Sequence, residues 1–204
     1  MKKKLIKVAV LVSGGGTNLQ AILEFERDGK LTDGEVTLVV SSKDGVKALT
    51  RAENYGIKNV VVERKGKSQA DFEKELVSVL EENDIEVIVL AGFMCILSKD
   101  FTDRYPDRII NVHPSLIPSF CGEGFYGLKV HEAALAYGVK VTGATVHFVN
   151  EIPDGGKIIM QKAVKVKKGD SPESLQKRVM EEAEWQILPA ALEKVCQSIM
   201  KGEN

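Results

Sequence analysis

The chain has 204 residues and a formal net charge of −1, with 28 Lys and Arg against 29 Asp and Glu. This length fits one domain of ordinary size, so we expect a single domain over residues 1–204. The balanced charge disfavours a protein dedicated to nucleic acid or to a membrane surface, and we expect neither as a partner.

The three cysteines, Cys95, Cys121 and Cys196, are widely spaced and include no C-x-x-C pair. This pattern argues against a disulfide framework or a thiolate metal site, and it favours a reducing compartment. The apolar run over residues 8–12 follows Lys7, is too short to span a membrane and leads directly into glycines, so it predicts a first strand rather than a signal peptide. We therefore expect a cytoplasmic protein with no bound metal.

Short β-branched runs alternate with amphipathic segments over the first two-thirds of the chain. Helical spacing is evident in Leu19, Ile22 and Leu23, and again after Ser68, whose position predicts a helix N-cap. Because the strands are nearly continuous in Val, Ile and Leu, they predict a doubly wound α/β fold with a mostly parallel sheet covered on both faces. The predicted strands cover residues 7–12, 36–40, 59–62, 87–90 and 109–112.

The pattern changes after Gly127. A short helix is predicted to about Tyr137, followed by two alternating segments, 141–149 and 157–166, joined by a turn over 150–156. These segments predict strands added at the sheet edge, at least partly antiparallel. Ser171 and Pro172 then open one last helix, whose inward positions run to Val195.

The stretch 13–18, Ser-Gly-Gly-Gly-Thr-Asn, lies between the first predicted strand and helix. Glycines allow close approach of an anion, and the free amides and dipole of a helix start favour a phosphate. Leu19 occupies the place of the third glycine of a dinucleotide fingerprint, and no Gly-Lys-Ser/Thr is present. We therefore expect a site for one phosphate, with an empty tight turn as the alternative.

Asn111 and His113 lie two residues apart at the end of a predicted strand, so their side chains point to the same side. An amide donor beside an imidazole suits acyl transfer, because it offers donors to a developing oxyanion and a group that titrates near neutral pH. A purely structural His113 remains the alternative. Asp154, in the predicted turn, would raise the pKa of His113 if the turn folds over it, although Asp-Gly is also an ordinary turn pair.

The other chemically versatile side chains have simpler interpretations. We expect His131 and His147 to be structural. Ser115 lacks a G-x-S-x-G context, and a nucleophilic role for Cys121 would require a lowered pKa.

Four segments, in this order and spacing, resemble the folate-dependent phosphoribosylglycinamide formyltransferase family: SGGGTNLQ, LAGFMCILS, NVHPSLIPSF and TGATVHFVNEIPDGG. The resemblance runs from Val8 to about Leu192. The N-x-H-P-S-L-x-P motif is shared by other enzymes that use 10-formyltetrahydrofolate, and the glycine-rich loop narrows the choice. The resemblance implies a Rossmann-like formyltransferase sheet.

The resemblance also implies site residues. The catalytic residues are Asn111, His113 and Asp154, and the substrate phosphate and ribonucleotide are bound by Gly16, Thr17, Asn18 and Glu184. Glu184 matches if one extra residue is allowed within 180–183. The folate is bound by Met94, Cys95, Ile96, Leu97, Gln69, Asn111 and Asn150.

Several positions depart from the family pattern. Cys95 and Gln69 stand where basic residues are frequent, with Lys67 as an alternative contact near Gln69. The loop over residues 120–128 is longer than usual, and Trp185 replaces a frequent histidine. These departures bear on ligand affinity more than on the chemistry.

The implied reaction moves the formyl group of 10-formyltetrahydrofolate, a co-substrate, to the amine of N1-(5-phosphoribosyl)glycinamide, in purine biosynthesis. The products are formylglycinamide ribonucleotide and tetrahydrofolate, and the protein is expected to be a monomer or homodimer. Three alternatives are a 10-formyltetrahydrofolate hydrolase, a methionyl-tRNA formyltransferase and a non-catalytic phosphoribosyl-ligand binding module. The two enzymes are disfavoured because they usually carry an additional domain.

Overall fold

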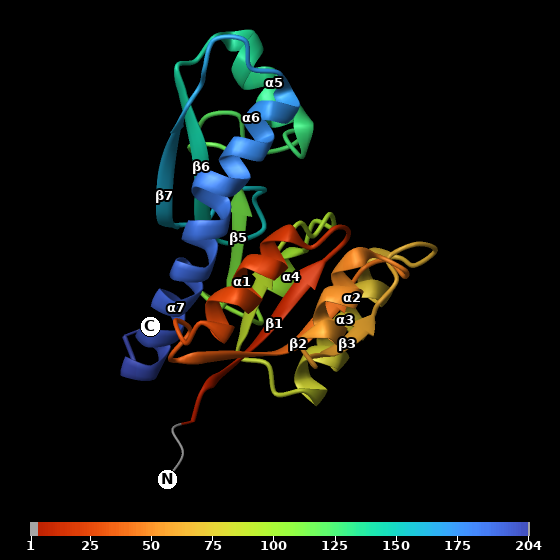
Figure 1. The fold of residues 1–204 in the computed structure, drawn as a ribbon. Coiled ribbons are helices and arrows are strands. Elements are labelled where there is room, and N and C mark those ends of the chain that lie inside the picture. Colours follow the sequence, from red (N-terminus) through yellow and green to blue (C-terminus); the bar gives the residue numbers. More distant parts are fainter. Residues whose placement is uncertain (1–3, 204) are drawn as a thin grey trace.

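The computed structural model describes residues 4–203, and its centre is a seven-stranded sheet in the order β3-β2-β1-β4-β5-β6-β7 (Figure 1). The strands are β1 (Ile6–Val12), β2 (Gly34–Ser41), β3 (Lys58–Val61), β4 (Val87–Leu90), β5 (Ile109–His113), β6 (Val141–Phe148) and β7 (Ile158–Lys165). The helices between them are α1 (Thr17–Arg27), α2 (Lys47–Asn54), α3 (Gln69–Glu82), α4 (Lys99–Thr102) and α5 (Leu128–Tyr137). The short α4 lies in a stretch where the sequence pattern predicts no helix.

The first five strands are parallel, whereas β6 runs antiparallel to β5, and β7 antiparallel to β6. The predicted doubly wound sheet with an antiparallel edge addition is therefore confirmed. The strand order reverses between β1 and β4, where open α/β sheets bind their ligands. The β5–β6 register places Asn111 opposite His147 and His113 opposite Thr145.

The two faces of the sheet are covered by different helices (Figure 1). Successive residues of a strand point to opposite faces, so Val8 and Val10 pack with α1, α2 and the C-terminal α7 (Trp185–Lys201), whereas Ala9 and Leu11 pack with α3 and α4. Side chains fully buried on both faces explain why the strands read as continuous apolar runs.

The C-terminal helix is interrupted, contrary to the prediction of one continuous helix. It consists of α6 (Pro172–Val179), a π-helical turn η1 (Met180–Glu184) and α7 (Trp185–Lys201). Ser171 caps α6 as predicted, because its hydroxyl accepts a hydrogen bond from the Ser174 amide at 3.2 Å. A π turn fits one more residue into a helix than the α pattern allows, and Glu184 is the last residue of this turn.

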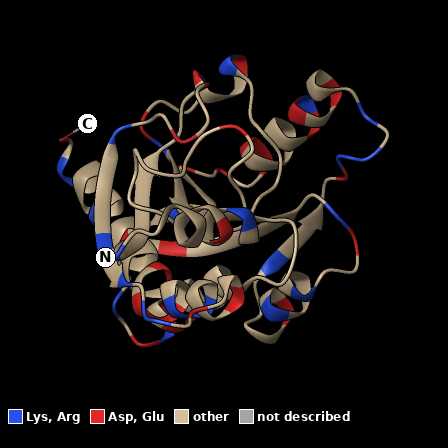
Figure 2. Ribbon diagram, turned by 90° about the horizontal axis from the view of Figure 1, so that it is seen from above, with Lys and Arg blue, Asp and Glu red and all other residues tan. Residues whose placement is uncertain are grey.

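Charged residues of both signs are interspersed over the elements (Figure 2), in agreement with the near-zero net charge. Within residues 4–203, no helix has both the length and the apolar character needed to cross a membrane.

Candidate active site

A cavity of about 830 Å³ lies at the carboxyl ends of the parallel strands. It collects side chains from segments that are far apart in the sequence. Among the predicted site residues, its wall includes Asn18, Met94, Cys95, Ile96, Asn111, His113, Asp154 and Glu184. Gly16, Thr17, Gln69, Leu97 and Asn150 do not form part of this wall.

The imidazole of His113 is held between a carboxylate and a backbone carbonyl. Its Nδ1 lies 3.4 Å from Oδ2 of Asp154, and its Nε2 lies 2.8 Å from the carbonyl oxygen of Phe120. Because a carbonyl oxygen only accepts, Nε2 carries a proton and donates it. Nδ1 is then the ring atom that faces Asp154, and His113 forms part of the cavity wall.

Opposing effects act on the pKa of His113. Burial lowers the pKa below the ordinary histidine value, while the Asp154 charge and the Phe120 carbonyl partly offset this. Since both ring neighbours are acceptors, the imidazolium is the form that satisfies them both. The site therefore binds a proton on His113 most readily when further negative charge develops beside it.

Asp154 is fixed by the loop that follows β5. The Gly122 amide donates to its Oδ2 at 2.8 Å. Burial raises the pKa of Asp154, but the neighbouring His147 ring, the Gly122 amide and His113 outweigh this, so the pKa lies below the usual value. Asp154 is thus ionised at neutral pH. Its φ of 56° is a left-handed conformation that Asp and Asn tolerate better than most residues.

His147, which the sequence pattern assigns to the structural histidines, lies inside this cluster. Its Nε2 is 3.3 Å from Nδ2 of Asn111 and 3.6 Å from Oδ1 of Asp154. Its Nδ1 is 2.7 Å from the Phe148 carbonyl oxygen. The pairing of β6 with β5 brings His147 to this cluster, and the strand pattern alone does not specify that pairing.

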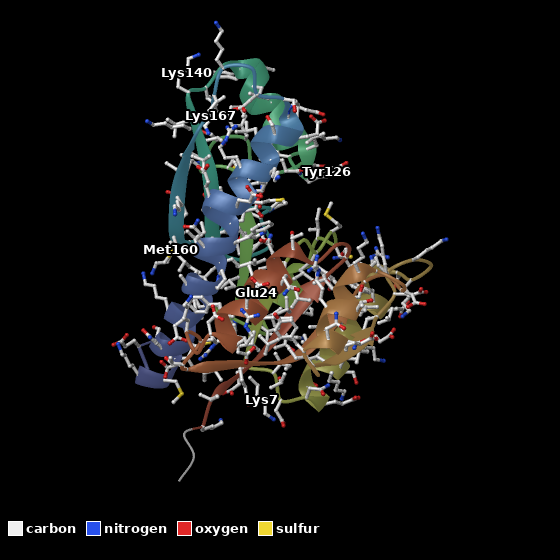
Figure 3. The ribbon with its side chains drawn as sticks, in the orientation of Figure 1. Lys7, Glu24, Tyr126, Lys140, Met160 and Lys167 are labelled. Carbon is white, nitrogen blue, oxygen red and sulfur yellow. The ribbon has the colours of Figure 1, made fainter. Side chains whose placement is uncertain are left out.

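The long loop over residues 120–128 contains Cys121, but the surroundings of its thiol do not favour a nucleophile. The thiol of Cys121 donates to the Pro118 carbonyl at 3.3 Å, and burial together with the Asp154 charge raises the thiol pKa. The buried hydroxyl of Ser115 donates to the Ser119 carbonyl. Tyr126, labelled in Figure 3, lies on the same loop with half of its side chain exposed.

The glycine-rich loop before α1 is shaped by α2. Gly16 has a φ of 71°, and a Cβ at this position would lie 2.7 Å from Cβ of Ala48. The Ala48 amide donates to the Gly14 carbonyl, and Nε of Arg51 donates to the Gly15 carbonyl at 2.9 Å. The first turn of α1 contains no acidic residue, so its amides and the helix dipole are available to an anion.

Glu184 reaches the start of α1 from the π turn. Its Oε2 accepts a hydrogen bond from Nδ2 of Asn18 at 2.8 Å. Burial raises the pKa of Glu184, and the Asn18 amide partly offsets this. The extra residue that the family resemblance requires within 180–183 coincides with the π turn, which brings the two side chains together.

The segment after β4 forms another part of the cavity wall. The Met94 amide donates to Oγ of Ser13 at 3.0 Å, which ties this segment to the glycine-rich loop. Met94 and Ile96 expose large apolar side chains. Gln69 is not part of the cavity wall. Its side chain donates to the Ile96 carbonyl at 2.9 Å and so supports the backbone of this segment.

The remaining predicted folate residues lie just outside the wall. Leu97 is buried in the core with α3 and α4. The side chain of Asn150 accepts from the Ile152 amide at 3.0 Å, which shapes the turn that carries Asp154.

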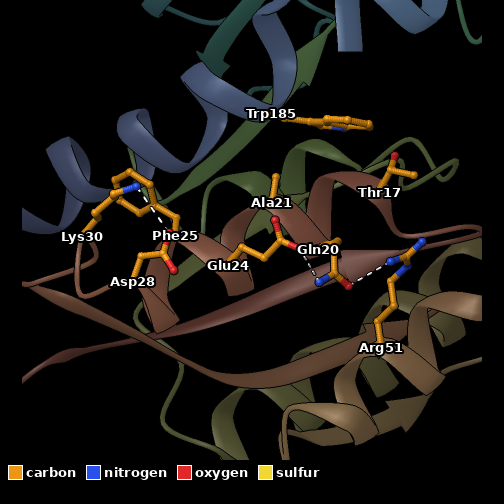
Figure 4. A pocket seen from close by; sticks show the side chains of 9 residues that line it. All are labelled: Thr17, Gln20, Ala21, Glu24, Phe25, Asp28, Lys30, Arg51 and Trp185. Atoms are coloured by element: carbon orange, nitrogen blue, oxygen red, sulfur yellow. Dashed lines mark hydrogen bonds and ion pairs between the residues drawn. The ribbon is translucent and has the colours of Figure 1, made fainter. Parts of the chain in front are cut away.

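A smaller cavity of about 350 Å³ lies between α1, α2 and α7 (Figure 4). Thr17 belongs to this cavity. Trp185 extends over α1, and Gln20 accepts a hydrogen bond from Arg51 at 2.9 Å. Thr17 lines this smaller cavity, whereas the next residue, Asn18, lines the main cavity.

Over residues 4–203, no group of three or more His, Cys, Asp and Glu side chains is arranged to hold a metal ion.

Comparison with known proteins agrees with this geometry. The formyl transferase family model matches residues 6–192. The chain is 44% identical to the trifunctional purine biosynthetic protein adenosine-3 of Homo sapiens, covering all of this chain and 20% of that protein. It is 37% identical to phosphoribosylglycinamide formyltransferase of Haemophilus influenzae, covering 91% of this chain and 85% of the relative.

Comparison with solved structures agrees with the sequence comparison. The crystal structure of glycinamide ribonucleotide transformylase 1 from Symbiobacterium toebii is similar with a TM-score of 0.88 and 37% identity, over 95% of this chain and 89% of that one. The chain spans only about a fifth of the length of the vertebrate relatives. The family match covers most of the chain and includes every element of the main cavity, and the chain therefore belongs to the formyl transferase family.

Proposed function

We propose that this protein transfers the formyl group of 10-formyltetrahydrofolate to the amine of N1-(5-phosphoribosyl)glycinamide, a step of purine biosynthesis. One observation carries the proposal. A single cavity is lined both by the cluster of Asn111, His113 and Asp154 and by the hydrogen-bonded pair of Asn18 and Glu184, and this pair lies beside the start of α1, whose free amides favour an anion. Such a cavity suits a direct transfer between two small molecules that are bound together.

The amine attacks the formyl carbon, and a tetrahedral oxyanion develops. The Asn111 amide donates to this oxygen, the positive charge of protonated His113 stabilises it, and ionised Asp154 stabilises the charge on His113. The new C–N bond then remains while the bond from carbon to the folate nitrogen breaks, and the proton lost by the amine is gained by that nitrogen. Phe120 keeps the ring oriented because its carbonyl engages the opposite nitrogen.

The two substrates have separate binding surfaces. The amides at the start of α1 bind the phosphate, and Asn18 with Glu184 binds the ribonucleotide. The segment Met94 to Leu97 and the turn from Asn150 to Asp154 enclose the folate ring, while Gln69 supports the backbone of the first segment.

A folate deacylation assay tests the function. The absorbance change of 10-formyltetrahydrofolate is followed with and without N1-(5-phosphoribosyl)glycinamide, and we expect turnover only when both are present. Turnover without the amine would identify a hydrolase. Transfer to methionyl-tRNA alone would identify a methionyl-tRNA formyltransferase. No turnover in any mixture would favour a non-catalytic module that binds a phosphoribosyl ligand.

Glu184→Gln is expected to weaken ribonucleotide binding while stabilising the empty protein at neutral pH. Loss of one charged hydrogen-bond acceptor should raise KM for the ribonucleotide about tenfold, with KM for the folate unchanged. A carboxyl whose pKa is raised in the folded state contributes stability below its unfolded pKa, and this is lost as pH rises through the folded pKa. The gain in Tm should therefore appear at neutral pH and vanish in acid. An unchanged KM for the ribonucleotide would contradict the assignment.

A further inference from the structure

The hydrogen bonds of His147 restrict its protonation state. Nδ1 lies 2.7 Å from the Phe148 carbonyl oxygen, which can only accept, so Nδ1 is the protonated nitrogen. In the neutral ring, Nε2 then carries a lone pair. The ring is buried, so water does not compete for this lone pair.

The Phe148 carbonyl is itself held firmly in place. A Cβ on Gly156 would lie 1.7 Å from this oxygen, so only glycine fits beside it. The Phe148 amide donates to the Lys157 carbonyl at 2.9 Å, and the next amide, of Val149, donates to Ile109 at 2.9 Å. The tautomer of His147 is thus set by backbone groups that the β5–β6–β7 ladder fixes.

The lone pair of His147 faces the amide nitrogen of Asn111 at 3.3 Å. The Asn111 side chain donates one N–H to His147, which fixes which end of the amide is nitrogen. Its second N–H then remains for the cavity, whose wall includes Asn111. The opposite orientation would turn the amide oxygen toward the lone pair of His147, and two acceptors would repel each other.

We propose that His147 is a positioning residue, which orients the Asn111 amide so that an N–H faces the oxygen of the reacting formyl group. The inference rests on the proposed formyl transfer. His147 does not contact the substrate in this arrangement; it acts through Asn111. Oδ1 of Asp154 lies 3.6 Å from the same Nε2.

Two substitutions separate this role from packing. His147→Leu fills the space without an acceptor, and we expect kcat to fall about 30-fold with both KM values within about twofold, less than the loss of a whole oxyanion donor. His147→Gln can place its amide oxygen near the position of Nε2, and it should recover kcat to within about fivefold of the native value. Equal losses in the Leu and Gln variants would overturn the proposal.

A double-mutant cycle shows whether His147 acts through Asn111. In an Asn111→Ala background, His147→Leu should cause no further loss of kcat, because the amide to be oriented is gone. Multiplicative losses would overturn the proposal.

An NMR measurement keeps the inference separate from the activity. The two Nδ2 protons of ¹⁵N-labelled Asn111 should resonate far apart in the native protein and draw together in His147→Leu. Unchanged Asn111 signals would overturn the inference even where formyl transfer holds. If the Asn111 signals change but the native protein transfers no formyl group, the inferred orientation of Asn111 stands and the proposed function is wrong.

Discussion

His113→Ala is expected to lower kcat roughly 10³-fold, the upper part of the range for a positioned acid–base group that also binds an oxyanion. The loss follows from the geometry, because His113 lines the cavity and its Nδ1 faces the Asp154 carboxylate. Binding of the ribonucleotide should persist, since the loop proposed to bind its phosphate follows β1 rather than β5. Steady-state kinetics and calorimetric binding of the ribonucleotide measure the two effects.

The matched control for His113→Ala is Lys140→Ala, at the far end of β6 (Figure 3). It should leave kcat within about twofold, as is usual for an exposed position. Both variants should melt in a single cooperative transition. Near-native turnover by folded His113→Ala would contradict the proposed role.

Asp154→Asn is expected to lower kcat about 10²-fold and to shift the pH dependence of turnover toward lower pH. The variant removes charge with little change of shape, because Asn tolerates the positive φ and its amide oxygen can still accept from Gly122. The Asp154 charge raises the pKa of His113 against the effect of burial, so its removal lowers that pKa further. The active imidazolium exists below the pKa and is lost as pH rises through it, so the alkaline limb moves to lower pH.

Two measurements check the Asp154→Asn prediction. The pH dependence of kcat locates the alkaline limb, and NMR titration of the His113 ring locates the pKa directly. An unchanged profile with a native fold would mean that Asp154 does not act through the charge of His113.

The sheet was accessible from the sequence because buried parallel strands leave continuous β-branched runs, and the alternating segments at the edge indicated antiparallel pairing. Asn111, His113 and Asp154 were predicted because a strand end and a polar turn are both visible as local patterns. Their approach in space is a tertiary property, and the structure places Asp154 within 3.4 Å of Nδ1 of His113.

Other parts of the site depend on register and could not be read from local patterns. The pairing of Asn111 with His147 joins residues on two strands through β5–β6 pairing, and an alternating segment shifted by two residues would have the same sequence pattern. The π turn before Glu184 has no reliable local signal. The family resemblance implies a folate contact for Gln69, but the direction of a side chain at a helix start depends on its neighbours, here the Ile96 carbonyl.

The loop after β5 holds both His113 and Asp154 with backbone groups. The Phe120 carbonyl holds His113, and the Gly122 amide holds Asp154, with one residue between the two contacts. The spacing of this short stretch is therefore as constrained as the identity of the two side chains that it holds. Extra residues between Phe120 and Gly122 would move one contact relative to the other, whereas the loop after Gly122 can change length without altering this spacing.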